Sequence, residues 1–282
     1  MATVRAAPVF LKIGGGDDGC TSVVLKELSK AVGKDFELQP SEIGSERLPL
    51  FTHVTSGLEF TLIPGGEFSF GLSEEEEDAA RKISDPSPID VAMLRPVLRR
   101  RVSSFLFSSR PIAIASVTPV LGDKCLSEYD RENGEPTYPA YLKREDAAKI
   151  ASDFGCRLST EVEWEYACRA NAATLFPWGN KLPSRRELGE WLDLEHPDRL
   201  KPNGFGLYGL FSGDWCLDQW TASHHDNASA VSDVYVIKGG GSVFWPWQGS
   251  GEWKWCMPAN RMPSTGLING RCAFRLVRVL QF

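Results

Sequence analysis

The fold of this chain is decided by the stretch Cys156-Arg157-Leu158-Ser159-Thr160-Glu161-Val162-Glu163-Trp164-Glu165-Tyr166-Ala167. Thr160 stands three residues before Glu163, which is the spacing of a capping box. In that motif the Thr hydroxyl and the Glu carboxylate each cap the other residue's backbone N–H. Good helix formers continue from Glu161 to Arg169,. The pattern therefore predicts a helix over residues 161–169.

Other segments outside this stretch have helical patterns. Arg144 to Phe154 predicts a helix with one apolar side, formed by Ala147, Ile150 and Ala151,. Ser22 to Val32 has apolar residues near helical spacing and predicts a short amphipathic helix,. The acidic run from Glu74 to Asp78 is typical of a solvated helix start. Beyond Asn171 the sequence favours only short strands and turns.

Strand patterns precede these helices. Residues 58–68 alternate as a strand, turn at Pro64-Gly65-Gly66 and resume, which predicts the first hairpin of the main fold,. Val102 to Phe107 and Ile112 to Val117 predict a second strand pair. The basic run from Arg95 to Arg101, with four Arg, is expected to flank a strand,.

The composition places the 282-residue chain among ordinary globular proteins, with 42% hydrophobic and 24% charged residues,. Its 26 Gly and 18 Pro indicate a turn-rich body,. A net charge of −6 gives no attraction to phosphate backbones, so we expect no nucleic-acid partner,. No stretch approaches the roughly 18 apolar residues of a membrane helix, and the N-terminus lacks the apolar core of a signal peptide. We therefore expect that the protein does not insert into a membrane and that it is synthesised in the cytoplasm. Its final location stays open.

Cysteine and histidine usage gives no sign of a metal or redox centre. The seven Cys are an odd number without the dense spacing of a disulfide scaffold, and no Cys-x-x-Cys pair exists,. With only four His, a His-rich metal site is hard to assemble,. His224-His225 is the only His cluster, and the side chains of adjacent residues usually point apart. Most cysteines are expected to be buried thiols.

Several motifs occur in the order typical of the formylglycine-generating-enzyme superfamily, which the chain resembles. They are the opening stretch at 156–167, Phe176-Pro177-Trp178-Gly179-Asn180, Asn203-Gly204-Phe205-Gly206-Leu207-Tyr208, Lys238-Gly239-Gly240-Gly241-Ser242 and Ala273-Phe274-Arg275-Leu276-Val277. The resemblance implies an α+β, C-type-lectin-like fold of the formylglycine-generating-enzyme type, turn-rich with short strands and few helices. Such motifs identify a fold and not an activity.

The expected domain organisation follows from this resemblance. Residues 51–282 form the C-type-lectin-like domain, and residues 1–50 form an N-terminal appendage packed on it. Within the domain, residues 240–278 are the region in which we expect ligand binding. No internal repeat or low-complexity linker divides the chain.

The chemistry of the namesake enzyme is not expected here. Its activity rests on two nearby Cys that bind copper(I), a soft metal that prefers thiolates, whereas residues 251–261 contain only Cys256. The family's calcium-binding segment is best matched by residues 216–221, where Cys216 and Gln219 replace oxygen ligands,. Asp214 and Asp218 are the residues that remain available for calcium. We predict no catalytic residue, no metal site and no cofactor.

The end of the chain resembles the variable proteins of diversity-generating retroelements, which share this fold and whose C-terminal residues are rewritten by adenine-directed mutagenesis. Cys256-Met257-Pro258-Ala259-Asn260-Arg261 is similar to the ending Cys-Arg-Pro-Ala-Asn-Arg of such proteins. Template AAC codons mutated at their adenines yield residues encoded as NNC. Residues 268–272 and Val243-Phe244 are all reachable in that way.

The resemblance implies a ligand-binding protein of the receptor type that performs no chemistry, with an unknown protein or other macromolecule as its partner and an oligomeric state left open. Exposed aromatic rings supply contact area at small entropic cost, although Trp245 and Trp253 are equally compatible with core positions. The expected ligand-binding residues are Val243, Phe244, Trp245, Trp247, Trp253, Trp255, Met257, Met262, Ile268, Asn269, Gly270, Arg271 and Cys272.

Two alternatives remain open at this point. One is a copper-dependent formylglycine-generating-type oxidase that acts on a peptide cysteine, with Cys256 and Cys272 as thiolates. The other is a scaffold subunit of a larger assembly.

Overall fold

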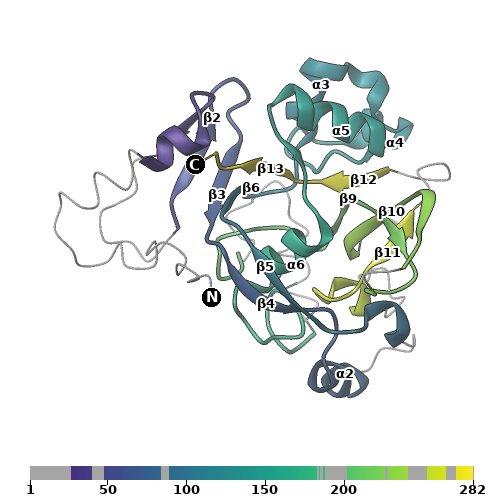
Figure 1. The fold of residues 1–282 in the computed structure, drawn as a ribbon. Helices are drawn as coiled ribbons and strands as arrows, with labels where there is room; N and C mark the ends of the chain where they lie inside the picture. The colour runs from purple at the N-terminus through teal and green to yellow at the C-terminus, as the bar shows by residue number, and fades with distance from the viewer. Residues whose placement is uncertain are drawn as a thin grey trace.

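A computed structural model describes residues 27–39, 48–83, 89–182, 184, 187, 202–225, 228–240, 253–264 and 271–281. Two sheets and a two-stranded ribbon organise these residues (Figure 1). The six-stranded sheet has the order β1 (Phe36–Leu38), β2 (Leu50–His53), β3 (Glu59–Ile63), β6 (Phe105–Ser108), β13 (Leu276–Val279), β8 (Arg157–Leu158). The five-stranded sheet has the order β11 (Met262–Ser264), β10 (Ala230–Gly240), β9 (Ser212–Thr221), β12 (Arg271–Phe274), β7 (Leu142–Lys143). The ribbon pairs β4 (Gly66–Phe70) with β5 (Leu98–Val102).

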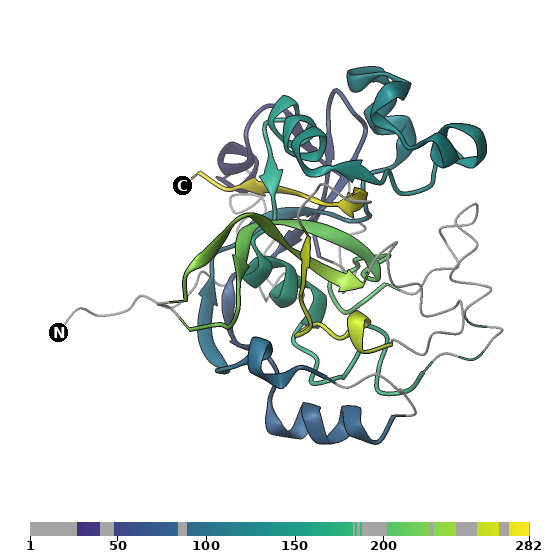
Figure 2. The same ribbon diagram turned by 90° about the vertical axis from the view of Figure 1, so that its right-hand side faces the viewer.

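The helices cover both faces of the sheets (Figures 1 and 2). They are α2 (Glu74–Arg81), α3 (Ile114–Leu121), α4 (Glu128–Asn133), α5 (Arg144–Asp153) and α6 (Glu161–Arg169), with 3-10 turns η1 (Val91–Leu94), η2 (Asp123–Cys125) and η5 (Trp253–Cys256). Residues 27–32 are also helical. The predicted helices at 144–154 and 161–169 are confirmed, and so is the helix start at Glu74.

The core divides because strand side chains alternate between two faces. In β6, Leu106 packs into one buried cluster with α5, whereas Phe105 and Phe107 pack into a second cluster with α6. All four residues of β6 are therefore buried. A third cluster lies under α2 and η5 and contains Leu72, Phe176, Trp253 and Met257 among others. The described part of the first fifty residues joins the first cluster, and β1 extends the six-stranded sheet.

The predicted strand pair of residues 102–107 and 112–117 does not form. The segment Ile112–Val117 was predicted as a strand, but α3 begins at Ile114, because Ile114 and Val117 reach the same core from successive helical turns,. The predicted strand over 102–107 is interrupted: β5 ends at Val102, and β6, which starts at Phe105, pairs with β3 and β13 instead.

The strands on either side of Pro64-Gly65-Gly66 exist, but they do not form a hairpin with each other. β3 pairs with β2 and β6, while β4 turns away to pair with β5. The expectation of only short strands after Asn171 is also wrong. β9 and β10 have 10 and 11 residues and pair with each other, with register shifts between Ala230 and Tyr235 and between Tyr235 and Ile237,.

Candidate functional site

The C-terminal region begins and ends on the five-stranded sheet. β10 is antiparallel to β9, with Gly240 opposite Ser212. β12 is parallel to β9, with Ala273 opposite Asp214, two residues further along. The end of β10 and the start of β12 therefore lie at the same end of the sheet. Gly240 precedes residues 241–252 and Arg271 follows residues 265–270, and both of these ranges lie outside the described residues.

Between those ranges, residues 256–262 form a buried connector. All seven residues are buried. The Asn260 side chain fixes the connector's turn, because its amide donates to the Lys254 carbonyl at 2.8 Å and its Oδ1 accepts from the Arg261 N–H at 2.9 Å. The Arg261 guanidinium stacks over the Trp220 ring, 4.5 Å from the centroid, and donates from Nη2 to Glu161 Oε1 at 3.1 Å. These bonds explain why Asn and Arg stand together here.

The structure places several of the predicted ligand-binding residues inside the molecule, which corrects the expectation that they face outward. Trp253 makes an edge contact with Trp178, with centroids 6.0 Å apart, and Met257 packs in the same third cluster. Met262 and Cys272 face the first cluster from β11 and β12. These four side chains are part of the core. Trp253 and Met257 pack in the cluster that includes Ala80 of α2, and Met262 on β11 and Cys272 on β12 pack in the first cluster. For Trp253, this decides between the two positions that the sequence left open.

The remaining predicted residues divide into two groups. Trp255 and Arg271 are half-buried, and the Arg271 guanidinium donates to the Cys125 carbonyl, which anchors it to η2. The other predicted residues lie outside the described part of the chain, and their ligand binding stays a prediction; they are Val243, Phe244, Trp245, Trp247, Ile268, Asn269 and Gly270.

The described residues do not fit a two-thiolate copper site. Cys256 lies in the third cluster, whereas Cys272 lies in the first cluster on β12. Burial raises the pKa of the Cys272 thiol, and the nearby Asp214 carboxylate raises it further, so the thiolate that copper(I) needs is disfavoured,. Within the described ranges, no group of three or more His, Cys, Asp or Glu could hold a metal ion.

The segment that matches the family's calcium site is also committed to other bonds. Asp214 Oδ2 accepts from Arg275 Nε at 2.9 Å and from the Trp164 indole at 2.8 Å. Asp218 Oδ2 accepts from the Glu161 N–H at 2.7 Å. The Leu217 carbonyl accepts from Arg144 Nη2 at 3.0 Å. Calcium requires about six oxygen ligands, and guanidinium and N–H donors already occupy oxygens of this segment, so the residues do not fit the ion.

A chain of buried charges supports the sheet next to this region. Lys238 on β10 donates to Glu165 Oε2, and Arg169 Nε donates to Glu165 Oε1, both at 2.9 Å. The Lys238 and Arg169 charges hold the pKa of the Glu165 carboxyl low despite its burial. Burial raises the pKa of Glu161 to about 7, although Arg261 opposes this. The sequence analysis did not predict these buried ion pairs. The family motifs contain the charged residues, but a motif does not say which charged side chains turn inward.

His224 is the one member of the predicted His pair that is buried. Its ring lies against the Phe70 ring, with centroids 4.2 Å apart. Burial, together with the nearby Arg261 and Lys238 charges, lowers the pKa of His224 to about 3. The imidazole is therefore neutral at physiological pH and packs as an aromatic ring. His225 next to it is exposed.

Comparisons with known proteins identify the family and the fold of this chain. Residues 50–280 match the family of the sulfatase-modifying factor enzyme 1-like domain. A formylglycine-generating enzyme from Bos taurus is 35% identical over 109 residues, which are 32% of this chain and 29% of that enzyme, so the chain matches less than a third of this relative's length.

Two solved structures share the fold. PvdO from Pseudomonas aeruginosa has a TM-score of 0.59 at 17% identity, with 84% of this chain and 100% of that chain covered. Variable protein 1 of Treponema denticola has a TM-score of 0.54 at 16% identity, with 87% and 99% covered. At such identities the likeness shows the fold alone. No described helix is long and apolar enough to cross a membrane.

Proposed function

Because the chain belongs to the family of sulfatase-modifying factor enzyme 1-like domains, we propose that it has kept the fold as a scaffold and works as a non-catalytic, receptor-type binding protein. The partner is a protein or another macromolecule. Residues 243–247 and 268–270 supply the contacts, and they vary by the adenine-directed mutagenesis of a diversity-generating retroelement.

One observation carries this proposal: the buried connector at 256–262 separates two segments, of which the first follows β10 and the second precedes β12 on the same sheet. Substitutions in a close-packed interior cost stability, whereas surface substitutions away from special features are usually near neutral. A binding surface that changes between copies therefore needs fixed internal anchors next to it. Asn260 and Arg261 are such anchors, because they bond to Lys254 and Glu161.

Two further findings support the proposal. Among the described residues, the donor sets expected for copper and calcium are separated between clusters or already bonded. The Treponema denticola protein with the same fold is called a variable protein. Residues 256–261 of this chain are similar to the ending of such proteins.

The test is the DNA around the coding sequence. We expect a second, near-identical copy of the 3′ segment that differs from the gene at adenines, beside a gene for a reverse transcriptase. The differences are expected at codons 243–247 and 268–270 and not at codons 258–261, which encode the buried anchors. A locus without the copy and without the reverse transcriptase would end the proposal that the segment is diversified.

The rival function is a copper-dependent oxidase acting on a peptide cysteine, which the 35% identity to the bovine enzyme favours. Incubation of the full chain with copper(I), oxygen and a sulfatase-type cysteine peptide tests it. We expect neither an aldehyde product by mass spectrometry nor stoichiometric copper retention after gel filtration. An aldehyde that disappears in Cys256→Ser would establish the oxidase and overturn the non-catalytic reading.

A further inference from the structure

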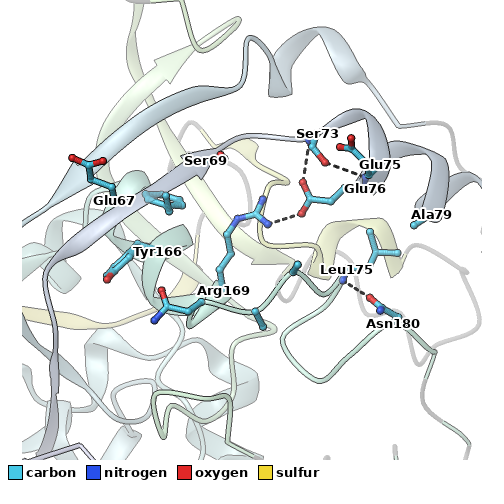
Figure 3. A pocket seen from close by; sticks show the side chains of 14 residues that line it. Glu67, Ser69, Ser73, Glu75, Glu76, Ala79, Tyr166, Arg169, Leu175 and Asn180 are labelled. Atoms are coloured by element: carbon cyan, nitrogen blue, oxygen red, sulfur yellow. Dashed lines mark hydrogen bonds and ion pairs between the residues drawn. The ribbon is translucent and has the colours of Figure 1, made fainter. Parts of the chain in front are cut away.

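A pocket of about 700 Å³ lies between β4, the start of α2 and the loop that follows α6 (Figure 3). Its volume is in the range of small-molecule sites, which is roughly 300–1,000 Å³. None of its lining residues belongs to the C-terminal region 240–278. We propose that this pocket binds a small organic cation, namely an ammonium or guanidinium group carried on an apolar stem. Such a site is separate from the proposed variable surface.

The charge of the lining favours a cation. Three carboxylates line the pocket, on Glu67, Glu75 and Glu76, against a single guanidinium on Arg169. Glu76 is paired with that guanidinium, and Glu67 forms an exposed ion pair with Arg99 at 3.5 Å, a kind of pair that contributes little and leaves the carboxylate accessible,. Glu67 and Glu75 come from β4 and α2 and lie on different sides of the pocket in Figure 3. The pocket therefore offers acceptors from two elements to a donor placed between them.

Arg169 does not make the pocket attractive to anions, because its donors are already engaged. Its Nε donates to Glu165, its Nη1 to Glu76 and its Nη2 to the Gly71 carbonyl. Figure 3 shows the guanidinium directed at Glu76. Two carboxylates thus share this one cation, and its positive charge is compensated inside the protein.

The N-terminus of α2 does not supply an anion site either. The Ser73 hydroxyl accepts from the Glu76 N–H, and Glu76 Oε2 accepts from the Ser73 N–H, so this capping box engages two of the amides at the helix start,. The helix dipole alone would disfavour a cation at this end. The side-chain charges of the first turn, Glu74 to Glu77, oppose that effect.

Aromatic and aliphatic groups form the apolar part of the pocket. The Phe68 and Tyr166 rings are tilted against each other with centroids 5.3 Å apart, and both line the pocket with Ala79 and Leu175. The Tyr166 hydroxyl donates to the Pro64 carbonyl at 2.9 Å, so its polar end is satisfied and its ring remains as a wall. Ring faces attract cations, and an apolar stem would replace water from these walls.

Isothermal titration of the full chain with three ligands of one shape tests the proposal. Phenethylamine carries a positive charge, 2-phenylethanol is neutral and phenylacetate is negative. We expect saturable binding of phenethylamine, at least about tenfold weaker binding of 2-phenylethanol and no binding of phenylacetate. Equal affinity for the three compounds, or no saturable binding of phenethylamine, would overturn the proposal.

Variants locate the site. Glu67→Gln/Glu75→Gln removes two carboxylates and is expected to weaken phenethylamine binding by about tenfold or more. Ala79→Trp adds a ring to the lining and is expected to block the pocket. Glu74→Gln is the matched control, because Glu74 is exposed in the same helical turn but does not line the pocket. Melting curves first establish that each variant folds. Binding that falls equally in Glu74→Gln, or that survives both pocket variants, would show that the site is elsewhere.

Discussion

Lys238 and Glu165 form an ion pair with 2.9 Å between Nζ and Oε2, and neither side chain has any solvent exposure. The pair joins the end of β10 to α6 across 73 residues of sequence. Gly239 follows Lys238 with φ +84°, and a Cβ there would come within 2.7 Å of the Trp164 ring. The end of β10, which precedes residues 241–252, is thus fixed by an ion pair and by a close backbone approach that only glycine allows,.

The first prediction concerns this pair. Lys238→Met leaves the Glu165 carboxylate buried with one partner fewer, and we expect a loss of about 3–5 kcal/mol in the free energy of unfolding, measured by urea denaturation. The double variant Lys238→Met/Glu165→Gln removes the uncompensated charge and is expected to recover part of that loss. Lys149→Met is the control, because Lys149 is exposed and its ion pair within the described residues is with the exposed Asp153. Its effect is expected within about 0.5 kcal/mol. A double variant less stable than the single one would contradict this account.

The local parts of the fold could be predicted from the sequence. The capping box of Thr160 and Glu163 depends on residues three positions apart, and both of its hydrogen bonds are present. The Ile112–Val117 segment was mistaken for a strand because β-branched residues favour strands locally, whereas its packing against the core favours a helix,. β-Propensity is a preference that tertiary contacts override.

The site was predictable only where the family motif fixes the backbone. The Lys238-Gly239-Gly240 motif was recognised, and it forms the end of β10. The partner of Lys238 was not recognised, because no local pattern points to Glu165. Met257, Met262 and Cys272 were expected to bind ligand because the chain's end resembles a variable region, and Trp253 was left open between surface and core. In the structure these residues instead fill clusters contributed by distant elements, such as Trp178 for Trp253. Burial of this kind is a property of the assembled layers.

The second prediction separates anchors from variable positions. Trp253→Ala removes a buried ring and is expected to cost about 3–5 kcal/mol of unfolding free energy. Under the proposed function Phe244→Ser and Trp247→Ser are surface changes, so each is expected to alter stability by no more than about 0.5 kcal/mol. Chemical denaturation of the three variants gives the comparison. Equal losses at all three positions would mean that Phe244 and Trp247 are core residues.

The third prediction follows from the contact of Arg144 with the altered calcium segment. The guanidinium donates to the Leu217 carbonyl and lies over the Tyr235 ring, 3.5 Å from its centroid. We expect the melting temperature to be the same with EGTA and with millimolar calcium, because a bound cation is not needed there. Arg144→Met is expected to lower stability by about 1–3 kcal/mol through the lost charged hydrogen bond and ring contact. Stabilisation of the wild-type chain by calcium would disprove the substitution of a guanidinium for the ion.

The last prediction concerns the pH dependence of stability. The pKa of His224 is lowered to about 3 in the folded chain from an ordinary 6.5, first by burial and then by Arg261 and Lys238. The unfolded chain therefore takes up a proton as the pH falls below 6.5, while the folded chain does not. Stability attributable to His224 is fully present above pH 6.5 and is lost as the pH falls toward 3. At pH 5 the loss is about 2 kcal/mol.

His224→Phe keeps a flat ring against Phe70 and removes this titration. Urea denaturation from pH 7.5 to 4.5 is expected to show a shallower fall in stability for this variant than for the wild type, whatever its absolute stability at pH 7.5. His225→Phe provides the control, because His225 is its exposed neighbour, and its pH profile is expected to follow the wild type. Carboxylates such as Glu165 titrate in both proteins and cancel in the difference between the two slopes. Parallel profiles for wild type and His224→Phe would show that the imidazole is protonated in the folded chain, and its packing against Phe70 as a neutral ring would then be wrong.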